Sequence, residues 1–226
     1  MQYKISIIHP SRSRPHQAEK TIQLWLDNAK DKSHIEYIIS VDIDDRNLKA
    51  YKELSSKYGT NIHIAKNKSA IEAINRGTKR SKGNLILVVS DDFLCEKNWD
   101  EKLLKELEGK EDFIVKTQDG IQPTLITLPI MDRTYYNRFG YVYETGYLHM
   151  FCDQEMTAVG MMLGKVINSQ QVFEHIHYST GKFEKDAISE KNDKTWNQGK
   201  KHFAERLKTN FGISDPVMKY SDIKWH

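Results

Sequence analysis

An apolar run that ends in adjacent carboxylates is the feature of the sequence that most restricts the fold. The run covers residues 85–89, follows Gly83 and leads directly into Ser90, Asp91 and Asp92. A run of branched apolar residues without alternation is typical of a strand buried on both faces, the usual condition of a central strand in a parallel sheet. The run therefore predicts an α/β fold with two acidic side chains at the carboxyl end of a central strand.

Adjacent carboxylates in that position repel each other unless a cation lies between them. Mg²⁺ and Mn²⁺ bind through one or two carboxylates and take their other ligands from water and substrate phosphates. The carboxyl edge of a parallel sheet is also where open α/β folds bind ligands. Asp91 and Asp92 are thus candidates for metal or ligand binding, and the alternative is a pair of turn-forming, helix-capping aspartates.

Strand and helix patterns alternate through the first half of the chain. Strands are expected at 5–9, 37–41, 61–65 and 85–89, and helices from Pro15, from Leu48 to Gly59 and from Ser69 to Arg80. Gly59 is a helix-terminating residue, and Ser69 with Glu72 forms a capping box. This alternation predicts a doubly wound, mostly parallel sheet.

The second half of the chain has a less regular pattern. Helices are expected at 99–107, 153–163 and 196–210, and extended segments at 113–115, 124–128 and 166–177. Residues 131–147 are rich in aromatic side chains, which either stack on a sugar or, more commonly, form part of a core. The polar segment 179–193 is a candidate lid, with a flexible surface loop as the alternative.

Composition restricts the class of partner and the compartment. The net charge of +3 comes from 34 basic and 31 acidic residues, and this balance does not favour a nucleic-acid partner. Cys95 and Cys152 have no CxxC spacing, so we expect neither a zinc site nor a disulfide framework. No apolar stretch is long enough for a signal peptide or a membrane span. We therefore expect a soluble, cytoplasmic protein without an integral membrane segment.

Three further clusters of polar residues bear on chemistry. Asp42 and Asp44 follow the second expected strand, where they either bind a nucleotide base or ribose, or belong to a turn and helix cap. Asp153 stands at a helix start, as a general base or as a complement to the helix dipole. His175 and His177 share a strand face and are either metal ligands or ordinary surface histidines.

The order of these motifs resembles glycosyltransferase family 2. The resemblance runs over residues 3–182 and includes Ile-Ser-Ile-Ile-His-Pro at 5–10, Ala-Ile-Asn-Arg-Gly at 73–77 and Val-Ser-Asp-Asp at 89–92, followed by an Asp-x-Glu helix and a late histidine. It implies the GT-A fold and a metal-dependent, inverting transfer. The expected donor is a nucleotide diphosphate sugar, with UDP as the nucleotide, and the expected acceptor is a hydroxyl group of a carbohydrate or another molecule.

The same resemblance implies roles for individual residues. Asp92, with His175 or His177, would bind Mn²⁺ or Mg²⁺, and Asp153 would be the catalytic base. The donor contacts that it implies are Pro10, Arg12, Asp42, Asp44, Asn75, Asp91 and Lys182. The sequence departs from the family pattern at Ser90, where the motif has an acidic residue, and at Cys152, where an acidic residue often precedes the base.

The resemblance also implies a domain organisation. Residues 1–180 would form the GT-A domain, with a nucleotide-sugar half at 1–95 and an acceptor and catalytic half at 96–180. Residues 181–226 would form a lid and helical extension.

Two other function classes compete with this interpretation. A sugar-nucleotide pyrophosphorylase would need a glycine-rich loop after the first strand, and residues 9–15 contain no glycine. A non-catalytic carbohydrate-binding protein is the other alternative, although the complete set of Asp92, Asp153 and His177 argues against a decayed site. Dinucleotide-binding and P-loop enzymes are disfavoured because neither GxGxxG nor GxxxxGK[ST] occurs.

Overall fold

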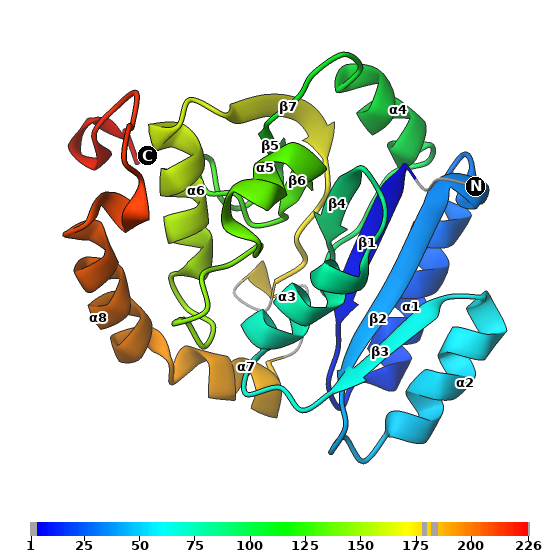
Figure 1. Ribbon diagram of the computed structural model, residues 1–226. Helices are drawn as coiled ribbons and strands as arrows, with labels where there is room; N and C mark the ends of the chain where they lie inside the picture. Colours follow the sequence, from blue (N-terminus) through cyan, green and yellow to red (C-terminus); the bar gives the residue numbers. More distant parts are fainter. Residues whose placement is uncertain (1–3, 178–179, 182–184, 226) are drawn as a thin grey trace.

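A mixed sheet forms the centre of the molecule (Figure 1). The computed structural model describes residues 4–177, 180–181 and 185–225. Within that part of the chain the seven strands follow the order β3-β2-β1-β4-β6-β5-β7. The strands are β1 (Ile5–Pro10), β2 (Ile35–Asp42), β3 (Asn61–Ala65), β4 (Leu85–Val88), β5 (Ile114–Gln118), β6 (Ile130–Asp132) and β7 (Val166–Val172). Only β6 runs antiparallel to its neighbours, β4 and β5, which confirms the expected mostly parallel α/β fold.

Helices pack on both faces of the sheet. The helices of the described chain are α1 (Pro15–Asp27), α2 (Leu48–Tyr58), α3 (Ala70–Arg80), α4 (Trp99–Glu106), α5 (Arg133–Phe139), α6 (Cys152–Met162), α7 (Ala187–Asp193) and α8 (Trp196–Leu207), of which α8 packs against α6 rather than the sheet. Side chains of β1 enter two cores, because successive side chains point to opposite faces. Ile5 and Ile7 pack in the core that contains Trp25 of α1. Ile8 belongs to the other core, with Ile74 of α3.

Short-range signals explain why the first-half elements were predicted closely. Gly59 ends α2 with a φ of 64°, a conformation that glycine adopts at little cost. Ser69 Oγ accepts a hydrogen bond from the Glu72 amide and caps α3. Gly83 permits the approach of β4 to β1, since a Cβ atom there would lie 2.6 Å from the amide nitrogen of Ser6.

The second half corrects one strand and adds two helices, α5 and α7. Residues 124–128 do not form the expected strand, because the Ile126 amide donates to Thr157 Oγ1 of α6 at 2.9 Å instead of to a neighbouring strand. The strand next to β4 is β6, which begins after Pro129. Helix α5 was not predicted, although Asp132 caps it by accepting from the Tyr135 amide. The other second-half helices α4, α6 and α8 lie where the pattern placed them.

Most aromatic residues of the 131–147 segment belong to the core. Four tyrosines of this segment are at most 7% exposed, namely Tyr135, Tyr136, Tyr143 and Tyr147. They are therefore unavailable for stacking on a sugar in this structure. Among the residues described, no helix has the length and apolarity required to cross a membrane.

Candidate active site

The polar clusters predicted from the sequence meet at the carboxyl edge of the sheet. β1 and β2 run parallel, as do β1 and β4, so Pro10, Asp42 and the segment after β4 all lie at the same edge. His175 joins this group through an isolated bridge between its backbone and that of Phe93. Residues far apart in sequence thus form one site.

Asp92 and His175 form the central pair of the site. The Asp92 carboxylate accepts from Ser90 Oγ at 2.5 Å and lies 3.2 Å from His175 Nε2. Burial raises the pKa of Asp92, but the hydrogen bond and charge of His175 outweigh it and lower the pKa overall. The His175 ring is stacked on Phe93, with centroids 4.2 Å apart. His177 lies beside it, at a ring distance of 5.1 Å.

Asp91 has a different environment from Asp92. Its carboxylate lies 2.9 Å from His9 Nε2 and 3.3 Å from Ser11 Oγ, and the side chain is only 5% exposed. Burial raises the pKa of Tyr37 well above its usual value, and the Tyr37 hydroxyl lies 2.8 Å from His9 Nδ1. One ring nitrogen of His9 thus contacts Tyr37 and the other contacts Asp91. Buried His9, which the sequence did not single out, therefore positions Asp91.

Arg12 connects the acidic residues at the carboxyl end of β2. Its guanidinium pairs with Asp42 and bonds Asp44 Oδ1 at 2.8 Å. Asp42 also accepts from Asn67 Nδ2 at 2.7 Å. The hydrogen bond from Arg12 lowers the pKa of Asp44, whose side chain is 69% exposed. The structure thus brings together Arg12, Asp42 and Asp44, which were predicted to contact the donor.

Asp153 stands at the start of α6. Its Oδ1 accepts a hydrogen bond from the Gln154 amide at 2.9 Å. Burial raises the pKa of Asp153, and the opposing effects of the backbone amides and of His175 are smaller. A carboxylate with a raised pKa is a better proton acceptor than an exposed aspartate.

An open pocket of about 470 Å³ lies next to Asp153. It is lined by Gln122, Thr124, Leu125, Met150, Phe151, Asp153, Gln154, Trp196 and Trp225. Local sequence patterns do not predict this pocket, because its walls come from four separated segments of the chain. Its size is adequate for a small ligand.

Comparison with known proteins identifies the family. The profile of the family described as "Glycosyl transferase family 2" matches residues 6–164. The chain belongs to glycosyl transferase family 2. No curated protein has a sequence that matches it.

Solved structures support the GT-A fold of this family 2 domain. The mannosyltransferase PcManGT from Pyrobaculum calidifontis, in complex with GDP-Man and Mn²⁺, has a TM-score of 0.69 at 11% identity, over 96% of this chain and 66% of that one. TarS 1–349 from S. aureus in complex with UDP-GlcNAc has a TM-score of 0.61 at 12% identity, over 75% of this chain and 57% of that one. The chain thus spans less than two thirds of either structure.

The donor set at the family 2 site fits a divalent metal in part. No group of three or more metal-ligating side chains is preassembled among the described residues. A carboxylate and an imidazole are nevertheless present at 3.2 Å from each other, in Asp92 and His175. Mn²⁺ accepts both ligand types, and Mg²⁺ sites commonly use one or two carboxylates with substrate phosphates. The pair is therefore suited to share a metal with a bound diphosphate.

Asn75, which was predicted to contact the donor, makes its described side-chain hydrogen bonds to the loop after α5. Asn75 Oδ1 accepts from the amides of Val142 and Tyr143, and its Nδ2 donates to the Tyr143 carbonyl. These bonds give Asn75 a structural task, attaching α3 to the loop after α5. Lys182 lies outside the described residues.

Two basic residues that the sequence analysis did not consider lie near the site. His149 is influenced electrostatically by Asp92, Asp193 and His177, burial lowers its pKa, and its buried Nδ1 has no hydrogen-bond partner in the described structure. Arg14 pairs with Asp186, with Nε and Oδ2 2.6 Å apart, and its charge also interacts with Asp91. No spacing rule marks either residue, because both act across the fold.

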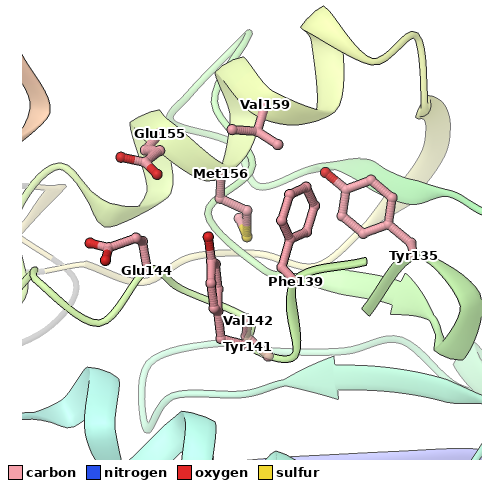
Figure 2. A pocket seen from close by; sticks show the side chains of 8 residues that line it. All are labelled: Tyr135, Phe139, Tyr141, Val142, Glu144, Glu155, Met156 and Val159. Carbon is pink, nitrogen blue, oxygen red and sulfur yellow. The ribbon is translucent and has the colours of Figure 1, made fainter. Parts of the chain in front are cut away.

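A second, small pocket lies beside α6 and is not a substrate site (Figure 2). It is lined by Tyr135, Phe139, Tyr141, Val142, Glu144, Glu155, Met156 and Val159 and holds about 20 Å³, room for one water. Glu155 accepts from Arg206 and from Tyr147. In the Asp-x-Glu pattern, Asp153 therefore lines the large pocket and Glu155 is a structural residue.

Proposed function

We propose that this family 2 domain transfers a sugar from a nucleotide diphosphate sugar, with UDP as the preferred nucleotide, to a hydroxyl acceptor with inversion of the anomeric carbon. The observation that carries the proposal is the placement of two carboxylates around His175. Asp92 bonds this histidine, and Asp153, beside the open pocket, is close enough for His175 to lower its pKa. The neighbouring structures are complexes with GDP-Man and Mn²⁺ and with UDP-GlcNAc, which supports a nucleotide sugar as the donor class.

Asp92 and His175, with His177 as a further candidate, would hold Mn²⁺ or Mg²⁺. Such an ion supplies positive charge that stabilises the diphosphate leaving group. Arg12, Asp42 and Asp44 would lie on the nucleotide side, at the end of β2. This arrangement extends the donor along the carboxyl edge of the sheet, as in other nucleotide-binding α/β folds.

Asp153 would act on the acceptor side. The acceptor oxygen attacks the anomeric carbon, its proton passes to the Asp153 carboxylate, and the bond between the sugar and the diphosphate breaks. The products are the glycoside and the nucleoside diphosphate, and a single displacement inverts the anomeric centre. Because Asp153 accepts the proton directly, no covalent intermediate on the protein is required.

Calorimetric titration with UDP tests the donor site. In the wild-type protein, Mn²⁺ should strengthen UDP binding, and Asp92→Ala should abolish that strengthening while the protein remains folded. Asp27→Ala is a matched control, since Asp27 is an exposed aspartate on α1 that pairs with Lys32. GDP serves as the competing nucleotide. Metal-dependent UDP affinity that persists in Asp92→Ala would overturn the metal assignment, and carbohydrate binding without nucleotide binding would favour a non-catalytic protein.

A further inference from the structure

The pocket beside Asp153 has a distinctive lining. Of its described lining residues, none is Lys, Arg or His, and Asp153 is the one ionisable side chain among them. Gln122, Thr124 and Gln154 supply neutral hydrogen-bonding groups. The indoles of Trp196 and Trp225 supply flat apolar surface. This combination suits a ligand that is neutral, rich in hydroxyls and apolar on one ring face.

Trp196 and Trp225 are each held in place by a neighbouring aromatic ring, with no ligand needed. Trp196 is 51% exposed, so part of its indole is accessible in the pocket that it lines. Its ring contacts Phe151 edge to face, with centroids 4.8 Å apart. Trp225 contacts Tyr220 at a centroid distance of 6.1 Å. Because neighbouring rings hold both indoles, stacking on them costs little conformational entropy.

Charge excludes the main competing class of acceptor. A phosphate-bearing or carboxylate-bearing acceptor would enter a pocket that contains the Asp153 carboxylate and no described cation in its lining. Binding an anion there would desolvate its charge without compensation. A purely aliphatic ligand would offer no hydrogen-bonding group to the side-chain amides of Gln122 and Gln154.

We infer that this pocket binds an uncharged sugar residue as the acceptor, with its ring against Trp196 and Trp225 and its hydroxyls facing the side-chain amides of Gln122 and Gln154. The inference rests on the proposed function, since it places the attacking hydroxyl at Asp153. Both tryptophans lie outside the residues 6–164 that match the family profile. The C-terminal extension would thus determine acceptor choice in this chain, while the matched region determines the donor.

Ligand-observed NMR titration tests the acceptor class. The protein, with UDP and Mn²⁺ added, is titrated with maltotriose, mannotriose and triacetylchitotriose as the neutral arm, and with glycerol 3-phosphate and a glucuronic-acid disaccharide as the charged arm. At least one neutral trisaccharide should bind, and the charged compounds should not. Trp196→Ala and Trp225→Ala should each weaken that binding about tenfold, whereas Trp→Phe at either position should largely retain it. Val217→Ala, which removes an exposed apolar side chain from the same C-terminal segment, is the control and should have no effect.

The results separate this inference from the proposed function. UDP affinity is measured in the same samples. If the wild-type protein shows no metal-dependent UDP binding, that result counts against the proposed function alone. Preferential binding of the charged arm, no binding of any neutral trisaccharide, or neutral binding that neither tryptophan substitution weakens would each overturn the acceptor assignment. Unfolding curves establish that the variants are folded before they are compared.

Discussion

Asp91 and Asp92 are neighbours in sequence but differ in what surrounds their carboxylates. The Asp91 carboxylate is held by His9 and Ser11 inside the fold. Asp92 bonds Ser90 and His175, and its side chain is 18% exposed. The environment, rather than residue type, therefore distinguishes two neighbouring aspartates that were both predicted as ligand-binding residues.

Asp153→Asn is the residue-scale test of the proposed base. Asparagine retains the size of the side chain but cannot accept the proton, so turnover should fall by about 10²-fold to 10⁴-fold with donor affinity nearly unchanged. Steady-state kinetics and UDP calorimetry measure the two effects. If donor affinity fell while turnover was retained, Asp153 would instead be a binding residue.

The pH dependence of turnover gives a second prediction for the same carboxylate. Burial raises the pKa of Asp153, and the base works only when deprotonated. Activity should therefore be lost as the pH falls through this raised pKa, at a pH above the roughly 3.9 of an exposed aspartate. The acid limb of a plot of kcat against pH measures this pKa. A limb at or below that reference value would contradict the assignment.

The late histidines are tested by their contribution to metal binding. His175 contacts Asp92 at 3.2 Å, so His175→Gln should weaken Mn²⁺ binding in the presence of UDP by about tenfold or more. His177→Gln is the matched comparison. Calorimetric titration with Mn²⁺ measures the metal affinity of both variants. Unchanged affinity in both variants would show that the histidines serve the fold and not the metal.

At the scale of elements, α7 depends on a residue from the other end of the chain. Asp186 caps this helix by accepting from the Ser189 amide at 2.9 Å, and it also pairs with Arg14. Burial raises the pKa of Asp186, but the pairing and capping bonds outweigh it and lower the pKa to about 2. The contact therefore persists in mild acid. This pairing places the helical part of the proposed lid beside the site.

Two substitutions separate the ion pair from the helix cap. Asp186→Asn keeps a good N-cap residue but removes the charge that pairs with Arg14, whereas Asp186→Ala removes both. Limited trypsin cleavage at Lys191 and Lys194 should therefore increase from wild type to Asn and again to Ala. Equal cleavage rates in the three proteins would show that neither contact holds α7 in place.

At the scale of the molecule, an ion pair attaches α8 to α6. Arg206 of α8 bonds Glu155 of α6 at 2.7 Å and also donates to the Phe211 carbonyl. Glu155 is 4% exposed in its side chain and Arg206 is 23% exposed. This link stabilises the position of α8, which begins with the pocket residue Trp196.

Arg206→Met should therefore lower the free energy of unfolding by about 3 kcal/mol, because Glu155 would remain buried without its cation. The estimate is at the low end for buried pairs, since the Tyr147 hydroxyl still bonds Glu155 at 2.7 Å. Lys102→Met is the control. It removes an exposed pair with Glu96 and should cost less than 1 kcal/mol. Urea unfolding measures both, and equal values would contradict the structural role of Arg206.

The sequence alone determined those features that depend on neighbours along the chain. Hydrophobic periodicity, the capping serine Ser69 and the terminating glycine Gly59 act within a few residues, and the first-half strands and helices were predicted from them. The run at 85–89 placed Asp92 at a strand end for the same reason. The motif order also indicated the family that the profile match shows.

Tertiary structure decided everything that depends on contacts across the fold. Residues 124–128 have a strand-like pattern, but a hydrogen bond to Thr157 of α6 takes the Ile126 amide away from the sheet. Likewise, Glu155 has a sequence position suited to chemistry and pairs with Arg206, while Trp225 reaches the pocket of Asp153 from the other end of the domain. The physical reason is common to these cases. Local patterns set the backbone, but burial and hydrogen-bond partners are assigned only when distant segments pack together.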